Sequence, residues 1–225
     1  MNDKFSVIIR CKNEERWIGH TIQSVIDFIP VNEIIIVDNS SEDDSLDIVK
    51  SFRKDPDLNG NSEYYTDINI VNISSYTPGY ALNLGIQSAK YENIVIISSH
   101  CVIKKFDISE IVLNLAKYIG IFGNQIPLYR GKRINKRYLW KHFTDSPVEN
   151  MYSDMEERHF FHNGASVFTK ESLLKYAFNE NIVGKEDRYW ANHVIKLGEN
   201  TLYDPINLEV DHHYTSNGNT WKGVG

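Results

Sequence analysis

Residues 33–45, read as EIIIVDNSSEDDS, place a carboxylate directly after a short apolar run. The apolar residues predict a buried strand that ends at Asp38. In open α/β sheets, ligands bind beyond the carboxyl ends of the strands, so a carboxylate there can accept hydrogen bonds from a nucleotide base or ribose. A strand-to-helix turn, in which Asp38, Asn39 and Ser40 satisfy backbone N–H groups, explains the same residues. Both interpretations stay open from this segment alone.

A second candidate for chemistry is a pair of adjacent carboxylates, Glu186 and Asp187, which follows Gly184 at the expected start of a helix. The positive end of the helix dipole lowers the pKa of a carboxyl group there, unless burial or a neighbouring negative charge opposes it. A carboxylate whose pKa is raised toward neutral pH can act as a general base on a hydroxyl group. Helix capping is the alternative explanation.

The composition limits the class of protein. The chain has 225 residues and is 41% hydrophobic, enough for one sizeable core. Its 30 acidic and 24 basic residues give a net charge of -6, which offers no general field for nucleic acid. Two cysteines, Cys11 and Cys101, are too few for a disulfide framework, and we expect reduced thiols. Neither a membrane-spanning apolar run nor a signal peptide is evident, so we expect a cytoplasmic location.

The elements that position these residues follow an alternation of apolar runs and helical patterns. This alternation predicts an α/β fold with a mostly parallel central sheet flanked by helices. Strands are expected at 5–10, up to 38, 68–73, 93–98 and 121–126, with helices at 17–29, 46–52, 81–89 and 109–119. Residues 54–67 are expected to form a solvated loop, and 128–150 a loop or irregular helices over the site. A strand at 160–169, helices at 171–176 and 187–197, and a last strand ending near Val210 complete the pattern.

Four motifs occur in a fixed order: RCKNEE at 10–15, IIIVDNSSEDDS at 34–45, PGYALNLGI at 78–86 and GKED at 184–187. Together they resemble the inverting family 2 glycosyltransferases, and the resemblance spans nearly the whole chain. It implies a GT-A fold in a single domain, 1–225. The nucleotide-sugar-binding half would be 1–127, and a less regular acceptor and catalytic half would be 128–225.

The resemblance also implies roles for particular residues. Arg10, Lys12 and Glu14 would border the nucleotide, Asp38 would contact its uracil or equivalent base, and residues 79–83, including Gly79 and Asn83, would lie beside the base and diphosphate. It places the catalytic base in the acidic pair, where we expect Asp187 rather than Glu186. Tight turns, surface ion pairs and a helix start are the structural alternatives for these motifs.

The chain departs from that family at the end of its central strand. Most members carry there an acidic pair, separated by one residue, that binds a divalent cation and the sugar diphosphate. Here Ser98, Ser99 and His100 occupy these positions. Neutral imidazole ligates first-row cations, whereas a serine hydroxyl would bind through water, so His100 is the preferred ligand for Mn²⁺ or Mg²⁺. Rhamnosyltransferase-like members look similar here, and an ordinary hydrogen bond of His100 is the alternative.

A late pair of histidines, His212 and His213, resembles the segment with which several GT-A enzymes complete the cation shell. The pair is expected directly after the last strand. Because adjacent strand residues point to opposite faces, at most one of the two should reach a given site, and His212 is slightly favoured. A surface turn is the alternative.

On the acceptor side, small or polar residues and an aromatic ring are expected to contact sugars. Asn163 and Gly164 permit close approach, Trp190 offers a stacking surface, and Gln125 lies in FGNQIP, which also looks similar in rhamnosyltransferase-like members. A basic cluster in the irregular segment is expected to close over phosphates: Arg130, Lys132, Arg133, Lys136 and Arg137.

The sequence therefore predicts an inverting transferase that moves a sugar from a nucleoside-diphosphate donor to a hydroxyl of a glycan or lipid-linked glycan. Synthesis of a bacterial surface polysaccharide such as capsule or lipopolysaccharide is the expected setting. No nucleic-acid partner is expected, and peripheral attachment at the inner face of the cell membrane stays open. A noncatalytic nucleotide- or glycan-binding module is the main alternative, because the acidic pair is replaced. A sugar nucleotidyltransferase fits less well, since its glycine-rich basic loop is not evident.

Overall fold

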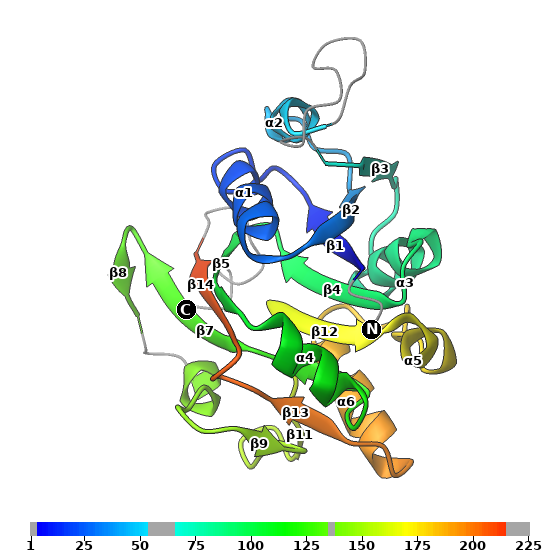
Figure 1. Cartoon of the computed structure of the whole chain (residues 1–225), viewed down its shortest axis with the longest axis vertical. Helices are drawn as coiled ribbons and strands as arrows, with labels where there is room; N and C mark the ends of the chain where they lie inside the picture. The colour runs from blue at the N-terminus through cyan, green and yellow to red at the C-terminus, as the bar shows by residue number, and fades with distance from the viewer. Residues whose placement is uncertain (1–3, 54–65, 135–137, 215–225) are drawn as a thin grey trace.

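The computed structural model describes residues 4–53, 66–134 and 138–214. Within them, strands form an eight-stranded sheet with the order β3-β2-β1-β4-β12-β6-β13-β9, a four-stranded sheet with the order β5-β14-β7-β8, and a two-stranded sheet of β10 and β11. Figure 1 shows the large sheet running through the molecule with helices packed against it.

The strands of the large sheet are β1 (Phe5–Cys11), β2 (Val31–Asp38), β3 (Ile68–Asn72), β4 (Asn93–Ser98), β6 (Gly120–Phe122), β9 (Val148–Glu149), β12 (Ala165–Thr169) and β13 (Thr201–Tyr203). The others are β5 (Cys101–Phe106), β7 (Asn124–Tyr129), β8 (Lys132–Arg133), β10 (Tyr152–Ser153), β11 (Arg158–His159) and β14 (Leu208–His213). The helices are α1 (Ile18–Phe28), α2 (Ser45–Ser51), α3 (Pro78–Ser88), α4 (Ile108–Leu115), α5 (Lys170–Lys175) and α6 (Glu186–Lys196), with a short 3₁₀ helix, η1, at Tyr138–His142.

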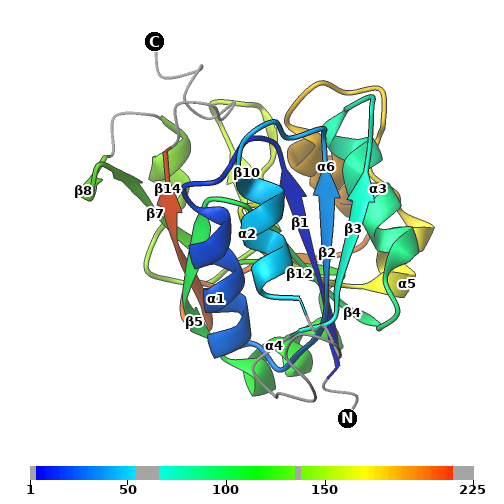
Figure 2. The same ribbon diagram turned by 90° about the horizontal axis from the view of Figure 1, so that it is seen from above.

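Helices cover both faces of the large sheet because its strands are apolar on both sides. In β1, Val7 and Ile9 face a core shared with α1, α2 and α4, whereas Ile8 faces a second core shared with α3, α5 and α6. Figure 2 shows α1 and α2 on one side of the strands and α3 on the other. Strands buried on both faces read as continuous apolar runs, which is why the parallel part of the sheet was predictable.

The carboxyl ends of the parallel strands meet at one edge of the sheet. Strands β3, β2, β1 and β4 run parallel, and the arrowheads of β1 and β2 point the same way in Figure 2. Strand β12 runs antiparallel to β4, so its beginning lies beside the end of β4, where the backbone N–H of Ser98 donates to the carbonyl of Gly164 over 3.1 Å. Residues near 10, 98 and 164 therefore lie close together.

The four-stranded sheet corrects three expectations. The expected strand at 121–126 is two strands, β6 and β7, which belong to different sheets and are separated by Gly123. A Cβ on Gly123 would overlap Leu208, so glycine lets the chain pass closely against β14 as it changes sheets. Strand β5, which the sequence did not suggest, pairs with β14, and β14 extends to His213 instead of ending near Val210.

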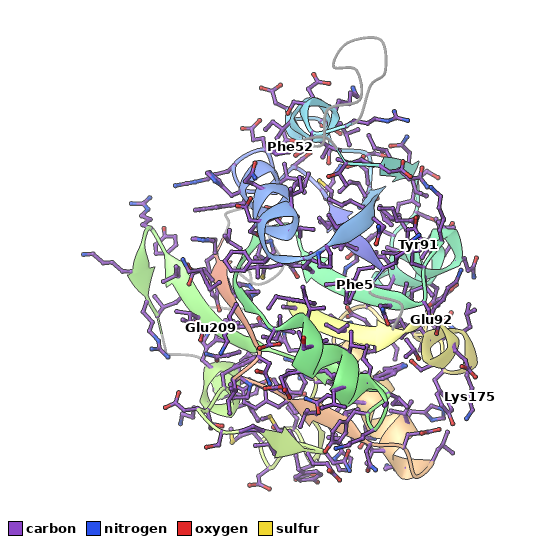
Figure 3. The ribbon with its side chains drawn as sticks, viewed as in Figure 1. Phe5, Phe52, Tyr91, Glu92, Lys175 and Glu209 are labelled. Carbon is purple, nitrogen blue, oxygen red and sulfur yellow. The ribbon has the colours of Figure 1, made fainter. Side chains whose placement is uncertain are left out.

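The remaining expectations are matched closely or shifted at their ends. Helix α4 ends at Leu115, short of the expected 119. The loop expected at 54–67 falls mostly outside the described residues. Figure 3 illustrates the contrast between interior and edge: Phe5 is buried and packs edge-on against Phe106 with ring centroids 5.8 Å apart, whereas Lys175 lies at the outer edge on α5. Among the described residues, no helix has both the length and the apolarity needed to cross a membrane.

Candidate active site

A cleft of about 720 Å³ lies at the edge where the parallel strands end. Its walls come from segments far apart in the sequence: the end of β1, the end of β4 with His100, the residues before β12, the start of α6, η1 and His212 on β14. A volume of this size is typical of small-molecule sites, which are concave and lined by a few convergent polar groups.

The acidic pair lies on the wall formed by the start of α6, and its two carboxylates have different partners. Oε1 of Glu186 forms an ion pair of 2.9 Å with Nη1 of Arg10. Oδ2 of Asp187 accepts the backbone N–H of Asn163 at 3.0 Å, and its Oδ1 accepts the backbone N–H of Arg188 at 2.8 Å and Nη1 of Arg188 at 3.2 Å. Both side chains are buried.

These surroundings displace the two pKa values in opposite directions. Burial, followed by the negative charge of Asp187, raises the pKa of Glu186 even though Arg10 opposes the shift. Burial also acts to raise the pKa of Asp187, but Arg188, His162 and the two backbone donors outweigh it, so that pKa is lowered. Asp187 is therefore the carboxylate that the protein holds ionised, and the rise in pKa that the sequence led us to expect for the base is found on Glu186 instead.

A buried glutamate supports this wall from behind. Glu156 lies 3.1 Å from Nε of Arg188 and 3.2 Å from Nζ of Lys185, and it accepts the hydroxyl of Tyr138 over 2.7 Å. Its pKa is lowered, because these partners outweigh the cost of burial. The contacts tie η1 and the turn before α6 together, and both segments line the cleft.

Two histidines face each other across part of the cleft. The rings of His100 and His212 are 4.9 Å apart between centroids. Nδ1 of His100 is 3.1 Å from Oε1 of Glu14, and because a carboxylate oxygen accepts, Nδ1 carries the proton. The lone pair of a neutral His100 ring is then on Nε2, the arrangement that carboxylate partners impose on metal-ligating histidines.

A third imidazole, His162, also lines the cleft, and burial lowers its pKa to about 4. Its Nδ1 receives the backbone N–H of Gly164 at 3.1 Å and lies 2.9 Å from Nε2 of Gln125. Oε1 of the same glutamine lies 2.8 Å from Nδ1 of His212. The ring of His162 is therefore neutral at physiological pH and is joined to His212 through one amide.

A sequence model of the family described as glycosyl transferase family 2 matches residues 6–177, most of the chain. The chain belongs to glycosyl transferase family 2. Among sequence relatives, the poly(ribitol-phosphate) β-N-acetylglucosaminyltransferase TarS of Staphylococcus aureus strain Mu50 is 23% identical over 229 residues, covering 93% of this chain and 36% of TarS. The poly-β-1,6-N-acetyl-D-glucosamine synthase of Staphylococcus epidermidis is 29% identical over 99 residues, covering 44% of this chain and 22% of that enzyme. The chain thus spans little more than a third of TarS.

Solved structures agree on the fold of this family 2 chain. The crystal structure of S. aureus TarS 1–349 in complex with UDP-GlcNAc superimposes with a TM-score of 0.70 at 15% identity, covering 99% of this chain and 62% of that one. The mannosyltransferase PcManGT from Pyrobaculum calidifontis, in complex with GDP-Man and Mn²⁺, gives a TM-score of 0.65 at 16% identity, covering 97% and 59%. The predicted family and the predicted GT-A fold are confirmed.

Most predicted site residues of this family 2 chain lie on the cleft wall. They are Arg10, Lys12, Glu14, Ser98, Ser99, His100, Asn163, Gly164, Glu186, Asp187 and His212. His213 points away and stacks on Trp17 with ring centroids 3.7 Å apart. The expectation that only one of the late histidines reaches the site is met by the alternation along β14.

Three residues expected beside the nucleotide have structural partners instead. The carboxylate of Asp38 is 1% exposed and binds the backbone N–H and the hydroxyl of Ser41, as in a capping turn; its neighbour Asn39 lines the cleft. The amide of Asn83 donates to the carbonyl of Phe178 and accepts its backbone N–H, while a Cβ on Gly79 would overlap the backbone at Asn179. Gly79 and Asn83 therefore anchor residues 178–180 against α3.

Two residues expected beside the sugar lie behind the cleft. Trp190 is in the core, packed edge-on against Phe168 and donating to the carbonyl of Tyr176 over 2.6 Å, because helix α6 turns that face toward the sheet. Gln125 is 1% exposed and contacts His162 and His212 instead of the cavity. In the predicted basic cluster, Arg130, Lys132 and Arg133 are exposed near the β7–β8 turn and absent from the cleft wall, while Lys136 and Arg137 lie outside the described residues.

Sequence reasoning gave no role of their own to three contributors to the wall, His162, Lys185 and Arg188, whereas Tyr138, which also lines the cleft, was expected as an aromatic surface for a sugar ring. His162 was visible only as part of a strand entry, since its partner Gln125 is 37 positions away. Lys185 and Arg188 flank the acidic pair in the sequence. Two cations beside two carboxylates at a helix start could have indicated that these side chains share one site.

Proposed function

We propose that this family 2 chain is an inverting glycosyltransferase that moves a sugar from a nucleoside-diphosphate donor to a hydroxyl of a glycan or lipid-linked glycan. The supporting observation is the convergence of an ionised carboxylate, a pair of imidazoles and four cationic side chains on one cleft at the carboxyl edge of the sheet. The cationic side chains are Arg10, Lys12, Lys185 and Arg188. Ligands of α/β sheets bind at this edge.

Asp187 is our candidate for the general base. Oδ1 already accepts two hydrogen bonds and Oδ2 accepts one, so within the described part of the chain Oδ2 keeps a lone pair for an acceptor hydroxyl. As the acceptor oxygen forms its bond to the anomeric carbon, its proton passes to Oδ2, and the bond from that carbon to the diphosphate breaks on the opposite face. The nucleoside diphosphate leaves with the bonding electrons.

The departing diphosphate needs positive charge. Lys12 lies at the end of β1, where its ammonium group donates to the carbonyl of Ser40 over 2.5 Å and leaves further N–H donors for phosphate oxygens. Arg10 is held at the same wall by Glu186, and its pKa is raised, because Tyr76 and Glu186 outweigh the effect of its burial. Both cations stand at the edge where the resemblance places the nucleotide.

A divalent cation fits the same wall in part. The Nε2 lone pair of His100 and the neighbouring ring of His212 suit Mn²⁺, which accepts imidazole ligands, and Glu14 supplies the orienting partner of His100. Within the described ranges, no cluster of three or more His, Cys, Asp or Glu residues is arranged to hold a metal ion. His100 and His212 would therefore hold a cation jointly with diphosphate oxygens and water, and the cation would supply charge for the leaving group.

The halves of the chain divide the work in this proposal. Residues 1–127 supply the nucleotide side of the cleft, and residues 128–225 supply the acceptor side with the base. Two relatives are named for N-acetylglucosamine transfer or polymer synthesis in staphylococci, which supports a role in a bacterial surface polysaccharide. Peripheral association with the inner face of the cell membrane would bring the enzyme to a lipid-linked acceptor.

The test is a calorimetric titration with UDP, GDP, dTDP and CMP, each with and without Mn²⁺, followed by transfer assays with sugars carried on the nucleotide that binds. We expect one nucleoside diphosphate to bind preferentially and its sugar derivatives to support transfer with inversion of the anomeric centre. Failure of every nucleotide to bind would reject the proposed function.

A noncatalytic module is the second candidate, because Ser98 and His100 replace the usual acidic pair and no three-ligand cluster stands in the described residues. Such a module would bind the nucleotide without turnover under any combination of metal and acceptor. If no transfer is seen, the donor should be tested for hydrolysis to free sugar. Hydrolysis would show that the chain is a catalyst tested without its proper acceptor, whereas an intact donor would favour the noncatalytic module.

A further inference from the structure

One buried amide connects two imidazoles of the cleft. Gln125 is 1% exposed, with Nε2 at 2.9 Å from Nδ1 of His162 and Oε1 at 2.8 Å from Nδ1 of His212. A buried polar side chain is retained when its hydrogen bonds are satisfied, and here both ends of the amide are used. The two histidines lie on different elements, His162 just before β12 and His212 on β14.

The backbone of Gly164 determines where the protons are. Its N–H, which can only donate, points at Nδ1 of His162 over 3.1 Å, so that nitrogen is an acceptor. The part of the Gln125 amide that faces the same nitrogen must then be the NH₂ group, and the carbonyl oxygen must face His212. That oxygen accepts, so Nδ1 of His212 carries a proton. The order of donors and acceptors follows from the Gly164 N–H alone.

Opposite tautomers result on the two rings. In the neutral state His212 carries its proton on Nδ1 and a lone pair on Nε2, whereas His162 carries its proton on Nε2. His162 lines the cleft and its Nδ1 edge is turned to the amide, so the N–H edge is the one available to a bound oxygen. One ring therefore offers electrons and the other offers a proton.

We propose that Gln125 is a positioning residue that makes His212 an electron-pair donor for a cation and His162 a hydrogen-bond donor for an oxygen of the bound sugar nucleotide. Only an amide side chain presents one acceptor and one fixed NH₂ donor at this spacing. A carboxylate at position 125 would accept from both rings, and an alkyl group would bond to neither. The identity of the ligand in this proposal rests on the proposed function. The two tautomers do not, because they follow from the hydrogen bonds of the protein itself.

Close packing maintains this arrangement. A Cβ on Gly164 would overlap the amide group of Gln125, so glycine both donates its N–H and makes room for the amide. A Gly164→Ala substitution should therefore displace Gln125 without changing a polar side chain. It provides an independent way to disturb the same network.

The direct test is long-range ¹H–¹⁵N correlation on ligand-free protein with labelled histidine, which distinguishes the two neutral tautomers and the imidazolium. Signals are assigned with His162→Asn and His212→Asn. We expect the Nδ1–H form for His212 and the Nε2–H form for His162. The same tautomer on both rings would overturn the assignment.

Two substitutions then separate the roles. In Gln125→Glu, His212 keeps an acceptor but His162 loses its donor, so we expect His212 to keep the Nδ1–H tautomer, the His162 signal to change, and sugar-nucleotide affinity to fall at least tenfold. In Gln125→Met, both signals change and the gain in affinity produced by Mn²⁺ is also lost. Gly164→Ala is expected to resemble Gln125→Met, and Gln87→Met on the exposed surface of α3 is the matched control.

The outcomes are separable from those of the proposed function. Wild-type tautomers and wild-type affinity in the folded Gln125→Glu protein would overturn the role of Gln125. Absence of any nucleotide binding by the wild type would overturn the proposed function, while the tautomers of the ligand-free protein still test the proton assignment.

Discussion

Glu186 and Asp187 are adjacent in the chain, yet the protein displaces the pKa of Glu186 upward and that of Asp187 downward. Arg10 contacts only the first of them, whereas Asp187 receives Arg188 and two backbone N–H groups. Adjacent carboxylates in one cleft with separated pKa values are the usual mark of divided roles. Here the ionised partner is the candidate base, and Glu186 holds Arg10 at the nucleotide side.

Asp187→Asn is expected to reduce transfer by about 100-fold or more, because loss of a general base typically costs 10²–10⁴-fold. Donor affinity should stay within a few-fold, since the base acts on the acceptor hydroxyl. The measurements are single-turnover transfer and calorimetric binding of the donor. Transfer at the wild-type rate would remove Asp187 from this role.

Glu186→Gln is the matched comparison at the neighbouring position. Because Glu186 holds Arg10, we expect a weaker affinity for the nucleoside diphosphate and a smaller loss of the transfer step. The reverse pattern, a larger loss of transfer in Glu186→Gln than in Asp187→Asn, would make Glu186 the base.

The same pair predicts a pH dependence of stability. The folded-state pKa of Asp187 lies below the ordinary 3.8. The stability that ionised Asp187 adds to the folded protein is therefore fully present above pH 3.8 and is lost as the pH falls through the folded pKa. The folded-state pKa of Glu186 lies above 4.5. The stability that protonated Glu186 adds to the folded protein is therefore fully present below pH 4.5 and is lost as the pH rises through the folded pKa. Urea midpoints measured across acid pH should therefore fall less steeply toward low pH in Asp187→Asn than in wild type.

In Glu186→Gln, the urea midpoint should instead fall less than in wild type as the pH rises from acid toward neutral. Asp187→Asn should cost about 1–3 kcal/mol at neutral pH, because it leaves buried donors of Arg188 and Asn163 without an ionised acceptor. Parallel pH profiles for wild type and both variants would contradict the opposite displacement of the two pKa values.

The parallel half of the fold was predictable because its strands are apolar on both faces and alternate with helices along the chain. Strand β5 was not, because its sequence, CVIKKF, is short and carries two lysines, and its pairing partner β14 lies about a hundred residues later. The break at Gly123 was equally hidden, since the apolar run around it reads as one strand and only contact with Leu208 separates β6 from β7.

The cleft wall was predictable where a motif follows a strand, as at Arg10 and His100, or begins a helix, as at the acidic pair. It was not where function depends on partners distant in sequence. Asn83 looked like a nucleotide ligand until its amide was placed on the backbone of Phe178. Gln125 looked like a sugar contact until its amide was placed between two histidines. Such pairings arise from tertiary packing, which no local pattern records.

The proposed cation contact predicts that His100→Ala and His212→Ala each reduce the Mn²⁺-dependent gain in nucleotide affinity by at least tenfold. His213→Ala is the matched control, because its ring lies next to His212 in sequence but stacks on Trp17 outside the cleft wall. The measurement is calorimetric titration of the nucleoside diphosphate with and without Mn²⁺, supported by the electron paramagnetic resonance signal of bound Mn²⁺. An equal response to Mn²⁺ in all three variants and wild type would reject both ligands.

Gly123→Ala tests whether close passage of the chain at Gly123 positions β7 and β14, the strands that carry Gln125 and His212. The added Cβ would overlap Leu208, and overpacking of this kind typically costs about 1–3 kcal/mol. The urea midpoint should fall accordingly, and Leu208→Ala in the same chain should not restore it, because the added Cβ also meets the backbone carbonyl of Leu208. Gly131→Ala is the comparison, because nothing lies near its Cβ and only its positive φ of 75° opposes the substitution. If Gly123→Ala were no more destabilising than Gly131→Ala, close passage against Leu208 would not be what separates β6 from β7.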